Sequence, residues 1–120
     1  MLLRRASPQA FDGVTRSVRR VAFMLRPSRD ESELSFYDAS RVSPVEVLTG
    51  APGEGWGVVA ITAGELRSLG FTLRRDSRSG DRTAEAHVLA RPATTDDGQI
   101  PAEVRLAIAI AALWMIEPQA

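Results

Sequence analysis

Residues Gly55–Leu73 read Gly-Trp-Gly-Val-Val-Ala-Ile-Thr-Ala-Gly-Glu-Leu-Arg-Ser-Leu-Gly-Phe-Thr-Leu and contain the signals of three consecutive elements. Val58–Ile61 is an apolar, mainly β-branched run, which predicts a buried strand. Thr62 stands three residues before Glu65, a spacing that predicts a capping box and about two turns of helix after it. Gly70 can adopt the left-handed conformation that ends a helix, and the residues after it begin another strand. This order predicts an α+β unit.

Further elements are expected on both sides of this unit. A Ser-Pro pair marks the start of a short helix over Pro44–Thr49. Strands are predicted over Phe71–Arg75 and over Ala84–Ala90 from the alternation of their apolar residues. A linker over 91–100 leads to a long helix over Pro101–Ile116, which is predicted from its proline start and its many alanines.

The first third of the chain has an ambiguous period. Over residues 9–25 the apolar side chains recur both at helical spacing and in the alternation of a strand. We interpret residues 1–15 as a flexible or irregular lead-in and Arg19–Arg26 as a strand. A polar turn over Pro27–Ser32 would then join this strand, as a hairpin, to a second strand over Glu33–Asp38.

The composition is that of an ordinary globular protein. Of 120 residues, 44% are apolar and 25% are charged, and fifteen basic residues balance fifteen acidic ones. This length suits a single domain over residues 1–120. Cysteine is absent, which excludes disulfides and thiolate metal sites. The expected fold is α+β, with a small, mostly antiparallel sheet of about four to five strands, two short helices and one long apolar C-terminal helix.

The expected C-terminal helix lacks a charged face. No residue from Leu106 to Ile116 is charged, whereas an amphipathic surface helix carries a polar stripe. The run is also shorter than the roughly 20 apolar residues of a membrane span. Either this helix is buried on most of its sides within the fold, or it covers the core with one face and offers the other to a protein partner or a second copy of the chain. We adopt the second alternative for the interface. The stripe assigned to this interface consists of Leu106, Ile110, Leu113 and Trp114.

Charge is distributed unevenly along the chain. Residues 1–29 hold seven arginines and one acid, and residues 30–66 hold seven acids and one arginine. Arg16, Arg19 and Arg20 could contact the phosphates of a nucleic acid. We favour mutual neutralisation of the two segments, because few aromatic residues accompany the arginines for stacking on bases. Nucleic acid is therefore a disfavoured partner.

A glycine-rich loop precedes the central strand. Gly50, Gly53, Gly55 and Gly57 surround Pro52. Phosphate-binding loops follow a strand and precede a helix, so that backbone N–H groups and the helix terminus meet the anion. Here the expected order is helix, loop, strand, which favours a plain turn connection.

His87 is the one histidine of the chain. On the expected strand it shares a face with Glu85, a carboxylate that could orient the imidazole for proton transfer. A metal centre normally needs at least two histidine or cysteine ligands, so we expect no metal and no cofactor. We favour a hydrogen-bonded structural histidine over a catalytic one.

Five motifs are distinctive: ELSFYDAS at 33–40, SPVEVL at 43–48, GWGVVAIT at 55–62, GELRSLG at 64–70 and HV at 87–88. Together they resemble a set of small uncharacterised bacterial proteins of about 100–120 residues, over roughly residues 20–117. The resemblance implies a bacterial origin and one compact domain. It implies no activity and transfers no functional residues.

These observations favour a non-catalytic bacterial interaction or accessory protein, of a regulatory, antitoxin-like or immunity-like kind, that binds a larger effector. The alternative is a small enzyme or nucleic-acid-binding protein that uses His87, Glu85 and the N-terminal arginines. An enzymatic role is the less favoured of the two. No apolar run typical of a signal peptide follows Met1, so we expect a cytoplasmic protein without membrane contact.

Overall fold

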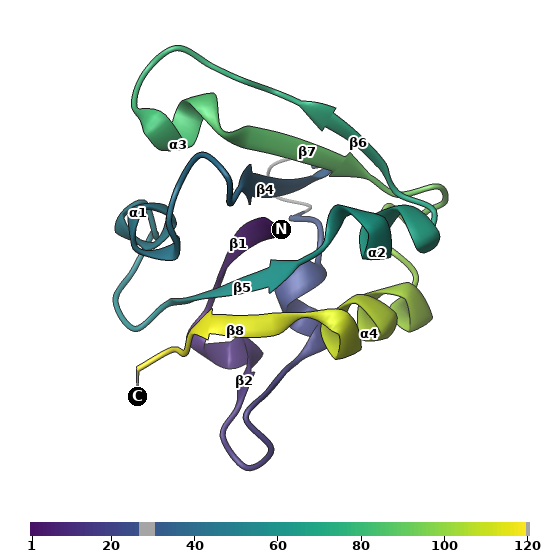
Figure 1. Cartoon of the computed structure of the whole chain (residues 1–120). Helices are drawn as coiled ribbons and strands as arrows, with labels where there is room; N and C mark the ends of the chain where they lie inside the picture. The colour runs from purple at the N-terminus through teal and green to yellow at the C-terminus, as the bar shows by residue number, and fades with distance from the viewer. Residues whose placement is uncertain (27–30, 120) are drawn as a thin grey trace.

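The main sheet has six strands in the part of the chain that the structure describes. This structure is a computed structural model, and it describes residues 1–26 and 31–119. The strand order is β6-β7-β4-β1-β5-β8, and every neighbouring pair is antiparallel (Figure 1). The six strands are β1 (Leu2–Ala6), β4 (Leu34–Asp38), β5 (Gly57–Ile61), β6 (Thr72–Arg75), β7 (His87–Arg91) and β8 (Leu113–Ile116). The α+β class and the mostly antiparallel sheet are confirmed, with more strands than the sequence predicts.

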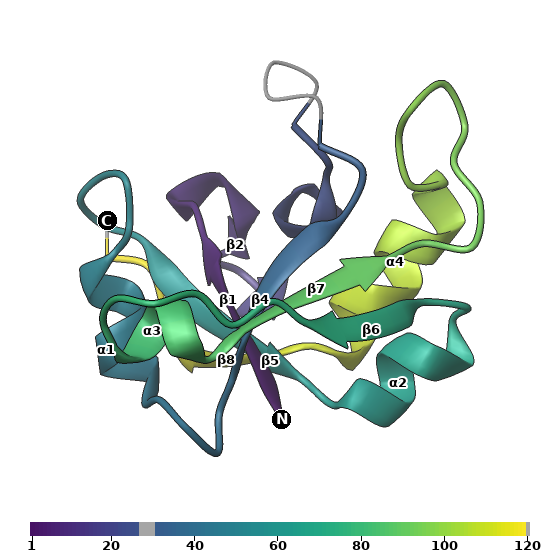
Figure 2. The ribbon, with the colours of Figure 1, turned by 90° about the horizontal axis from the view of Figure 1, so that it is seen from above.

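Helices gather at the two ends of the sheet. The α-helices among the described residues are α1 (Pro44–Thr49), α2 (Ala63–Ser68), α3 (Arg82–Glu85) and α4 (Ala102–Ala111). Figure 2 shows α2 and α4 together at one end and α1 and α3 at the other. The remaining elements are the 3-10 helices η1 (Pro8–Ala10) and η2 (Arg20–Phe23) and a small hairpin of β2 (Phe11–Asp12) and β3 (Ser17–Val18).

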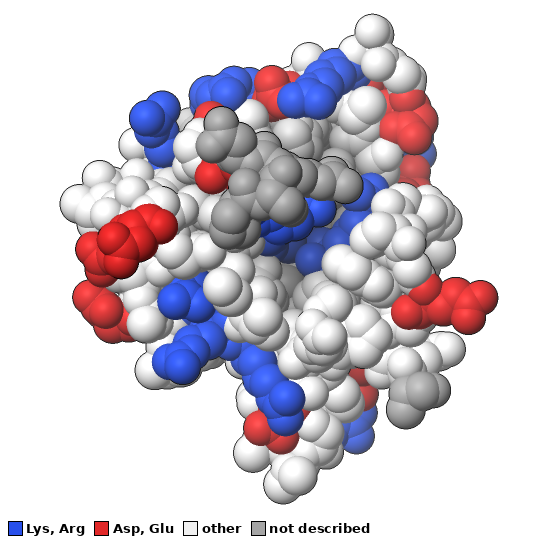
Figure 3. All heavy atoms as spheres, turned by 180° about the vertical axis from the view of Figure 1, so that it is seen from behind, with Lys and Arg blue, Asp and Glu red and all other residues white. Residues whose placement is uncertain are grey.

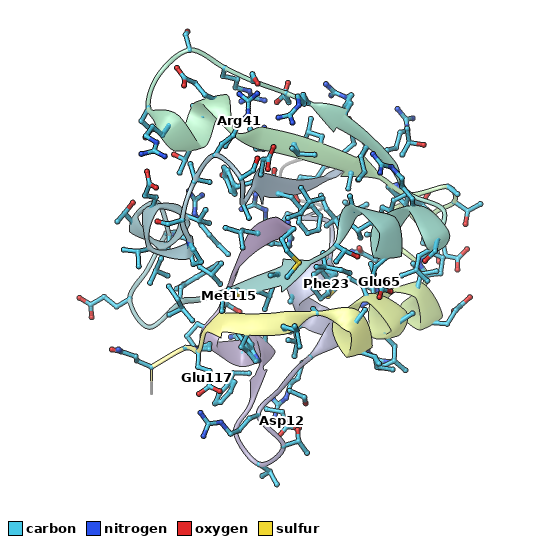
Figure 4. All side chains as sticks on the ribbon, viewed as in Figure 1. Asp12, Phe23, Arg41, Glu65, Met115 and Glu117 are labelled. Carbon is cyan, nitrogen blue, oxygen red and sulfur yellow. The ribbon has the colours of Figure 1, made fainter. Side chains whose placement is uncertain are left out.

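The sheet separates a larger core from a smaller one. The larger core lies under α2, α4 and η2 and includes the fully buried side chains of Phe23, Phe36 and Ile108. Figure 4 labels Phe23 in the middle of this layer. The smaller core lies under α1 on the other face and includes Leu3 and Val47. Strand β5 is buried along its whole length, as its continuous apolar run predicts.

Two expectations for the N-terminal third are wrong. Leu2–Ala6, inside the expected flexible lead-in, is β1 in the middle of the sheet, because its apolar residues supply both cores. The expected strand over Arg19–Arg26 contains η2 instead, so the expected hairpin does not form and β4 pairs with β1 and β7. The expected turn over Pro27–Ser32 falls largely on residues 27–30, which lie outside the described residues.

The prediction of a helix over Pro101–Ile116 is wrong for its last third. Helix α4 ends at Ala111, Ala112 has extended backbone angles, and Leu113–Ile116 then form the edge strand β8 beside β5. The alanines of this segment favour a helix locally, but a strand here covers the outer side of the buried β5 with an antiparallel ladder. Tertiary pairing therefore overrides local propensity.

The helix-start signals are confirmed at α1 and in part at α2, where the expected capping box of Thr62 and Glu65 has one of its two hydrogen bonds. The Ser43 hydroxyl accepts a hydrogen bond from the Glu46 backbone N–H, and the Glu46 carboxylate accepts one from the Ser43 N–H, which completes a capping box at α1. At α2 the Thr62 hydroxyl accepts from the backbone N–H of Glu65 at 3.1 Å. Gly70 follows this helix with φ 93°, the left-handed conformation expected of it.

Two glycines of the glycine-rich loop allow residues 116–119 to pack closely against the backbone of the loop. A Cβ built on Gly57 would meet the carbonyl oxygen of Ile116 and would lie 2.9 Å from the ring of Pro118. A Cβ on Gly55, which has φ +75°, would lie 2.8 Å from the carbonyl oxygen of Gln119. Residues 116–119 thus run directly over these two glycines.

Gly57→Ala is therefore expected to lower the free energy of unfolding by about 1–3 kcal/mol, because the added methyl group would push β8 away from β5. Gly64→Ala is the matched control, since a Cβ on Gly64 in α2 has no neighbour within 4 Å. That change should stabilise the protein by about 0.5–1 kcal/mol. Urea denaturation measures both, and equal effects of the two substitutions would contradict the assignment of Gly57.

Candidate functional site

His87 begins β7 on the sheet face opposite the larger core. Val88 and Ala90 point into that core, so His87 and Leu89 face the other way. The cross-strand neighbour of His87 is Tyr37 on β4, whose ring centroid lies 5.4 Å from that of the imidazole. The His87 side chain is 11% exposed, so its ring is largely covered.

Two side chains from neighbouring strands hold the imidazole of His87. Asp76, the residue directly after β6, places Oδ2 2.9 Å from Nδ1. Ser35 on β4 places its Oγ 3.0 Å from Nε2. An ionised carboxylate can only accept hydrogen bonds, so Nδ1 carries the proton of the neutral ring, and Nε2 accepts the hydrogen bond that the Ser35 hydroxyl donates. A hydrogen-bonded series of serine, histidine and aspartate thus runs from β4 through β7 to the residue that follows β6.

Asp76 is held in its charged form. The hydrogen bond with His87, together with the guanidinium of Arg78 at 2.8 Å, keeps the pKa of the Asp76 carboxyl below its usual value. A second cation, Arg74, lies 3.6 Å from the other carboxylate oxygen. The ionised carboxylate in turn favours the tautomer of His87 in which Nε2 is the free base.

Arg4 on β1 donates a hydrogen bond to the backbone of Ser35, on the side of β4 that faces away from β7. Its Nε donates to the carbonyl oxygen of Ala22 at 2.7 Å, and its NH1 donates to the carbonyl oxygen of Ser35 at 3.0 Å. Its guanidinium also lies 5.8 Å from the ring centroid of Phe36. Burial lowers the pKa of Arg4 to about 10, so the side chain is a cation at neutral pH.

Glu85 is not part of this cluster. The expected strand over Ala84–Ala90 begins only at His87, and Glu85 belongs to α3 with its side chain exposed. The sequence interpretation missed Ser35 and Asp76, which are 52 and 11 positions from His87. The alternation of the Glu33–Asp38 strand indicates that Ser35 faces away from the larger core, but the strand register that brings it to His87 is not visible in the sequence.

A second candidate surface lies at the other end of the sheet. We call Leu106, Ile110, Leu113 and Met115 the apolar strip. These side chains are 48%, 77%, 61% and 49% exposed, respectively. The first two lie one helical turn apart on α4, and the last two lie two residues apart on β8. Three of the four residues were expected in an interface from the sequence, and Met115 was not.

Trp114, the fourth residue of the expected stripe, has a different position. It lies on β8 with its half-buried side chain against the larger core. Its ring meets that of Phe11 edge-on, with 5.6 Å between the centroids, and its indole N–H donates to the carbonyl oxygen of Ser17 at 3.0 Å. Trp114 thus connects the β2–β3 hairpin to the sheet. Side chains alternate along a strand, so the side chain of Trp114 points away from those of Leu113 and Met115.

The three arginines considered for nucleic acid have different surroundings. Arg16 sits in the β2–β3 turn and forms a two-point ion pair with Glu117, at 2.5 and 3.0 Å. Arg19 and Arg20 are exposed at the start of η2. Figure 3 shows arginine atoms at several separate places on one face of the molecule, with acidic residues between them.

The expected neutralisation of the two charged segments occurs in one described ion pair, Arg26 with Glu31 at 2.7 Å. Most other acids of the 30–66 segment pair with arginines from the second half of the chain. These pairs are Glu33 with Arg74, Asp38 with Arg75 and Glu46 with Arg82. The segregation of charge along the sequence is therefore largely cancelled in space.

The glycine-rich loop borders an open depression of about 690 Å³. Trp56 contributes an aromatic wall, and the charged residues in the lining are Glu54 and Glu117. Glu117 is paired with Arg16, and the carboxylate of Glu54 would repel a phosphate group. The depression therefore supports the turn interpretation of this loop.

Comparisons with models of known families, with curated proteins and with solved structures found no match. Among residues 1–26 and 31–119, no three His, Asp or Glu side chains are grouped as a metal site would require. No helix in that part of the chain is long and apolar enough to cross a membrane. The resemblance to small bacterial proteins stays a prediction.

Proposed function

We propose that the protein acts by protein–protein recognition, with the apolar strip as its binding surface and a second copy of the chain as its partner. One observation carries this proposal: four large apolar side chains lie exposed within the ten residues from Leu106 to Met115. Exposed apolar residues that occur singly are ordinary, whereas four of them on two successive elements, α4 and β8, support an interaction site.

The charge pattern favours a second copy over an unlike partner. No residue from Leu106 to Ile116 is charged, so a two-fold axis that sets the strip against itself brings no like charges together. Strand β8 is also an edge strand, with β5 as its one strand neighbour in the described part of the chain. The strips of two copies could therefore approach each other without displacing a strand.

The geometry of β8 favours a contact between two copies that uses side chains more than a continuous ladder of backbone hydrogen bonds. Val58 and Val59 of β5 pair with Ile116 and Trp114, so Met115 is an extra residue that forms a bulge. A bulge interrupts the backbone hydrogen-bond pattern at an edge and turns a side chain outward. An accessory role beside a larger protein, as expected from the sequence, would use the same strip for an unlike partner.

The test is light scattering after size exclusion over a range of protein concentrations. The wild-type chain should form dimers, and the double variant Ile110→Asp, Leu113→Asp should weaken dimerisation at least about 100-fold, because each carboxylate would be buried without a partner. Val45→Asp is the matched control, since Val45 is 64% exposed on α1 outside the strip.

Dimerisation of the control should equal that of the wild type. A strict monomer at all concentrations would exclude the second copy as partner. A dimer that resists the double variant would exclude the apolar strip as its interface. A circular dichroism melt of each variant checks that the fold persists.

A further inference from the structure

We propose that Ser35 is a nucleophile that accepts acyl groups from small esters, with His87 as its general base and Asp76 as the residue that positions the base. The proposal rests on the hydrogen-bonded chain Ser35 Oγ to His87 Nε2 at 3.0 Å and His87 Nδ1 to Asp76 Oδ2 at 2.9 Å. Nucleophile, base and orienting carboxylate within hydrogen-bond distance form the geometric signature of an activated serine.

The hydrogen-bond geometry suits this role. Asp76 accepts at Nδ1, which favours the tautomer with its proton on Nδ1, and the lone pair of Nε2 then faces the hydroxyl of Ser35. The guanidinium of Arg78 binds the same oxygen of Asp76, Oδ2, at 2.8 Å and stabilises the negative charge of this carboxylate. Ser35 can thus transfer its proton to a base that already accepts its hydrogen bond.

Other described serines lack this arrangement. The hydroxyl of Ser40 donates to the Asp38 carboxylate at 2.7 Å, and the hydroxyl of Ser77 donates to the Glu85 carbonyl oxygen at 2.8 Å. Neither acceptor is a base that titrates near neutral pH. Because the chain has one histidine, a histidine base activates Ser35 and no second serine.

A cation lies on the same sheet face as the nucleophile. Leu89 on β7 pairs with Ser35 on one side and with Arg74 on the other, so the three residues form one cross-strand row. The outer two are about 10 Å apart at Cα, within reach of an arginine side chain. The Arg74 guanidinium contacts Glu33 at 3.2 Å and is 56% exposed, so it is the group we assign to stabilise negative charge on an acyl oxygen.

Hydrolysis of the ester through an acyl-serine intermediate consumes only the ester and water. Ser35 Oγ attacks the ester carbonyl carbon as its proton moves to His87 Nε2, and the tetrahedral oxyanion forms near Arg74. The bond to the alcohol oxygen breaks, and the alcohol leaves with the proton from His87. Water then attacks the acyl-serine, gives its proton to His87 and releases the carboxylic acid while Ser35 regains its proton.

The site is separate from the surface proposed for protein recognition. Its residues lie on β4, on β7 and directly after β6, whereas the apolar strip lies on α4 and on β8 at the opposite edge of the sheet. The two proposals can therefore fail independently, and the strip variants should leave the reactivity of Ser35 unchanged.

The experiment treats the full-length protein with a fluorophosphonate and identifies the modified residue by mass spectrometry of peptides. The Ser35 oxygen–phosphorus bond forms and fluoride leaves, which yields a stable adduct. We expect one adduct, on Ser35, and parallel hydrolysis of p-nitrophenyl acetate through the same residue.

The variants separate an activated serine from a structural hydrogen bond. Ser35→Ala should abolish the adduct, and His87→Ala should slow labelling about 100-fold, with partial recovery when imidazole is added. Ser40→Ala is the matched control and should react like the wild type, because its hydroxyl contacts a carboxylate and no histidine. Thermal melts confirm that each variant is folded.

Absence of an adduct on the folded wild type would overturn the proposal. An adduct on Ser35 that forms equally fast in His87→Ala would overturn it as well, because His87 would then not act as the base. A purely structural histidine would change the melting temperature when replaced, but its replacement would not respond to added imidazole.

Discussion

Phe23→Ala is expected to lower the free energy of unfolding by about 3–5 kcal/mol. The ring of Phe23 is fully buried between the sheet and α4, in the same cluster as Phe36 and Ile108. The short η2 that carries Phe23 packs closely against α4, so truncation leaves a cavity that the neighbouring elements cannot easily fill. Urea denaturation monitored by circular dichroism measures the change.

Phe11→Ala provides the comparison for this prediction. Phe11 is half-buried on the β2–β3 hairpin and makes one edge-on contact with Trp114. Its removal should cost clearly less, about 1–2 kcal/mol, because solvent can occupy the vacated space. Equal losses for the two variants would show that η2 is not a central part of the core.

Arg4→Met is expected to destabilise the protein by about 2–4 kcal/mol. Methionine has a similar length but donates no hydrogen bond, so the carbonyl oxygens of Ala22 and Ser35 would both lose their donor. Each part-buried carbonyl oxygen that loses its donor costs about 1–3 kcal/mol, and removal of the desolvated cation offsets part of this loss. The lowered pKa of Arg4 records this unfavourable burial.

Arg5→Met is the matched control, one position along the same strand. Arg5 lies on the other face of β1, where its Nε donates to the carbonyl oxygen of Val47 at 2.6 Å and its guanidinium lies 4.9 Å from the ring centroid of Tyr37. Only one carbonyl loses a donor in this variant, so the loss should be about half that of Arg4→Met. A larger effect at Arg5 would contradict the role assigned to Arg4.

Elements with a complete local signal could be predicted from the sequence. Helix α1 has the predicted bounds Pro44–Thr49, because a serine cap and a proline specify its start within a few residues. Strand β5, helix α2 and strand β6 follow in the predicted order, with Gly70 in the left-handed conformation between the last two. Each of these signals acts between residues that are close in the chain.

Elements that depend on distant partners could not be predicted in this way. The last third of the expected C-terminal helix is a strand because β5 needs an antiparallel neighbour, and Leu2–Ala6 is a strand because β4 and β5 enclose it. The site shows the same limit. His87 stood out as the one histidine, but Glu85 was assigned to it by alternation along a strand that in fact starts at His87, two residues after Glu85.

The sequence by itself determined the α+β class, the unit from β5 through α2 to β6, and the uncharged segment from Leu106 to Ile116. Capping bonds, turn conformations and hydrophobic runs act over a few residues, so they can be read along the chain. Only the tertiary structure decided that β1, β4 and β7 lie between β5 and β6, and that Ser35 and Asp76 meet His87. Strand order and register depend on which apolar faces fit together across the whole sheet, and this long-range choice leaves no local pattern.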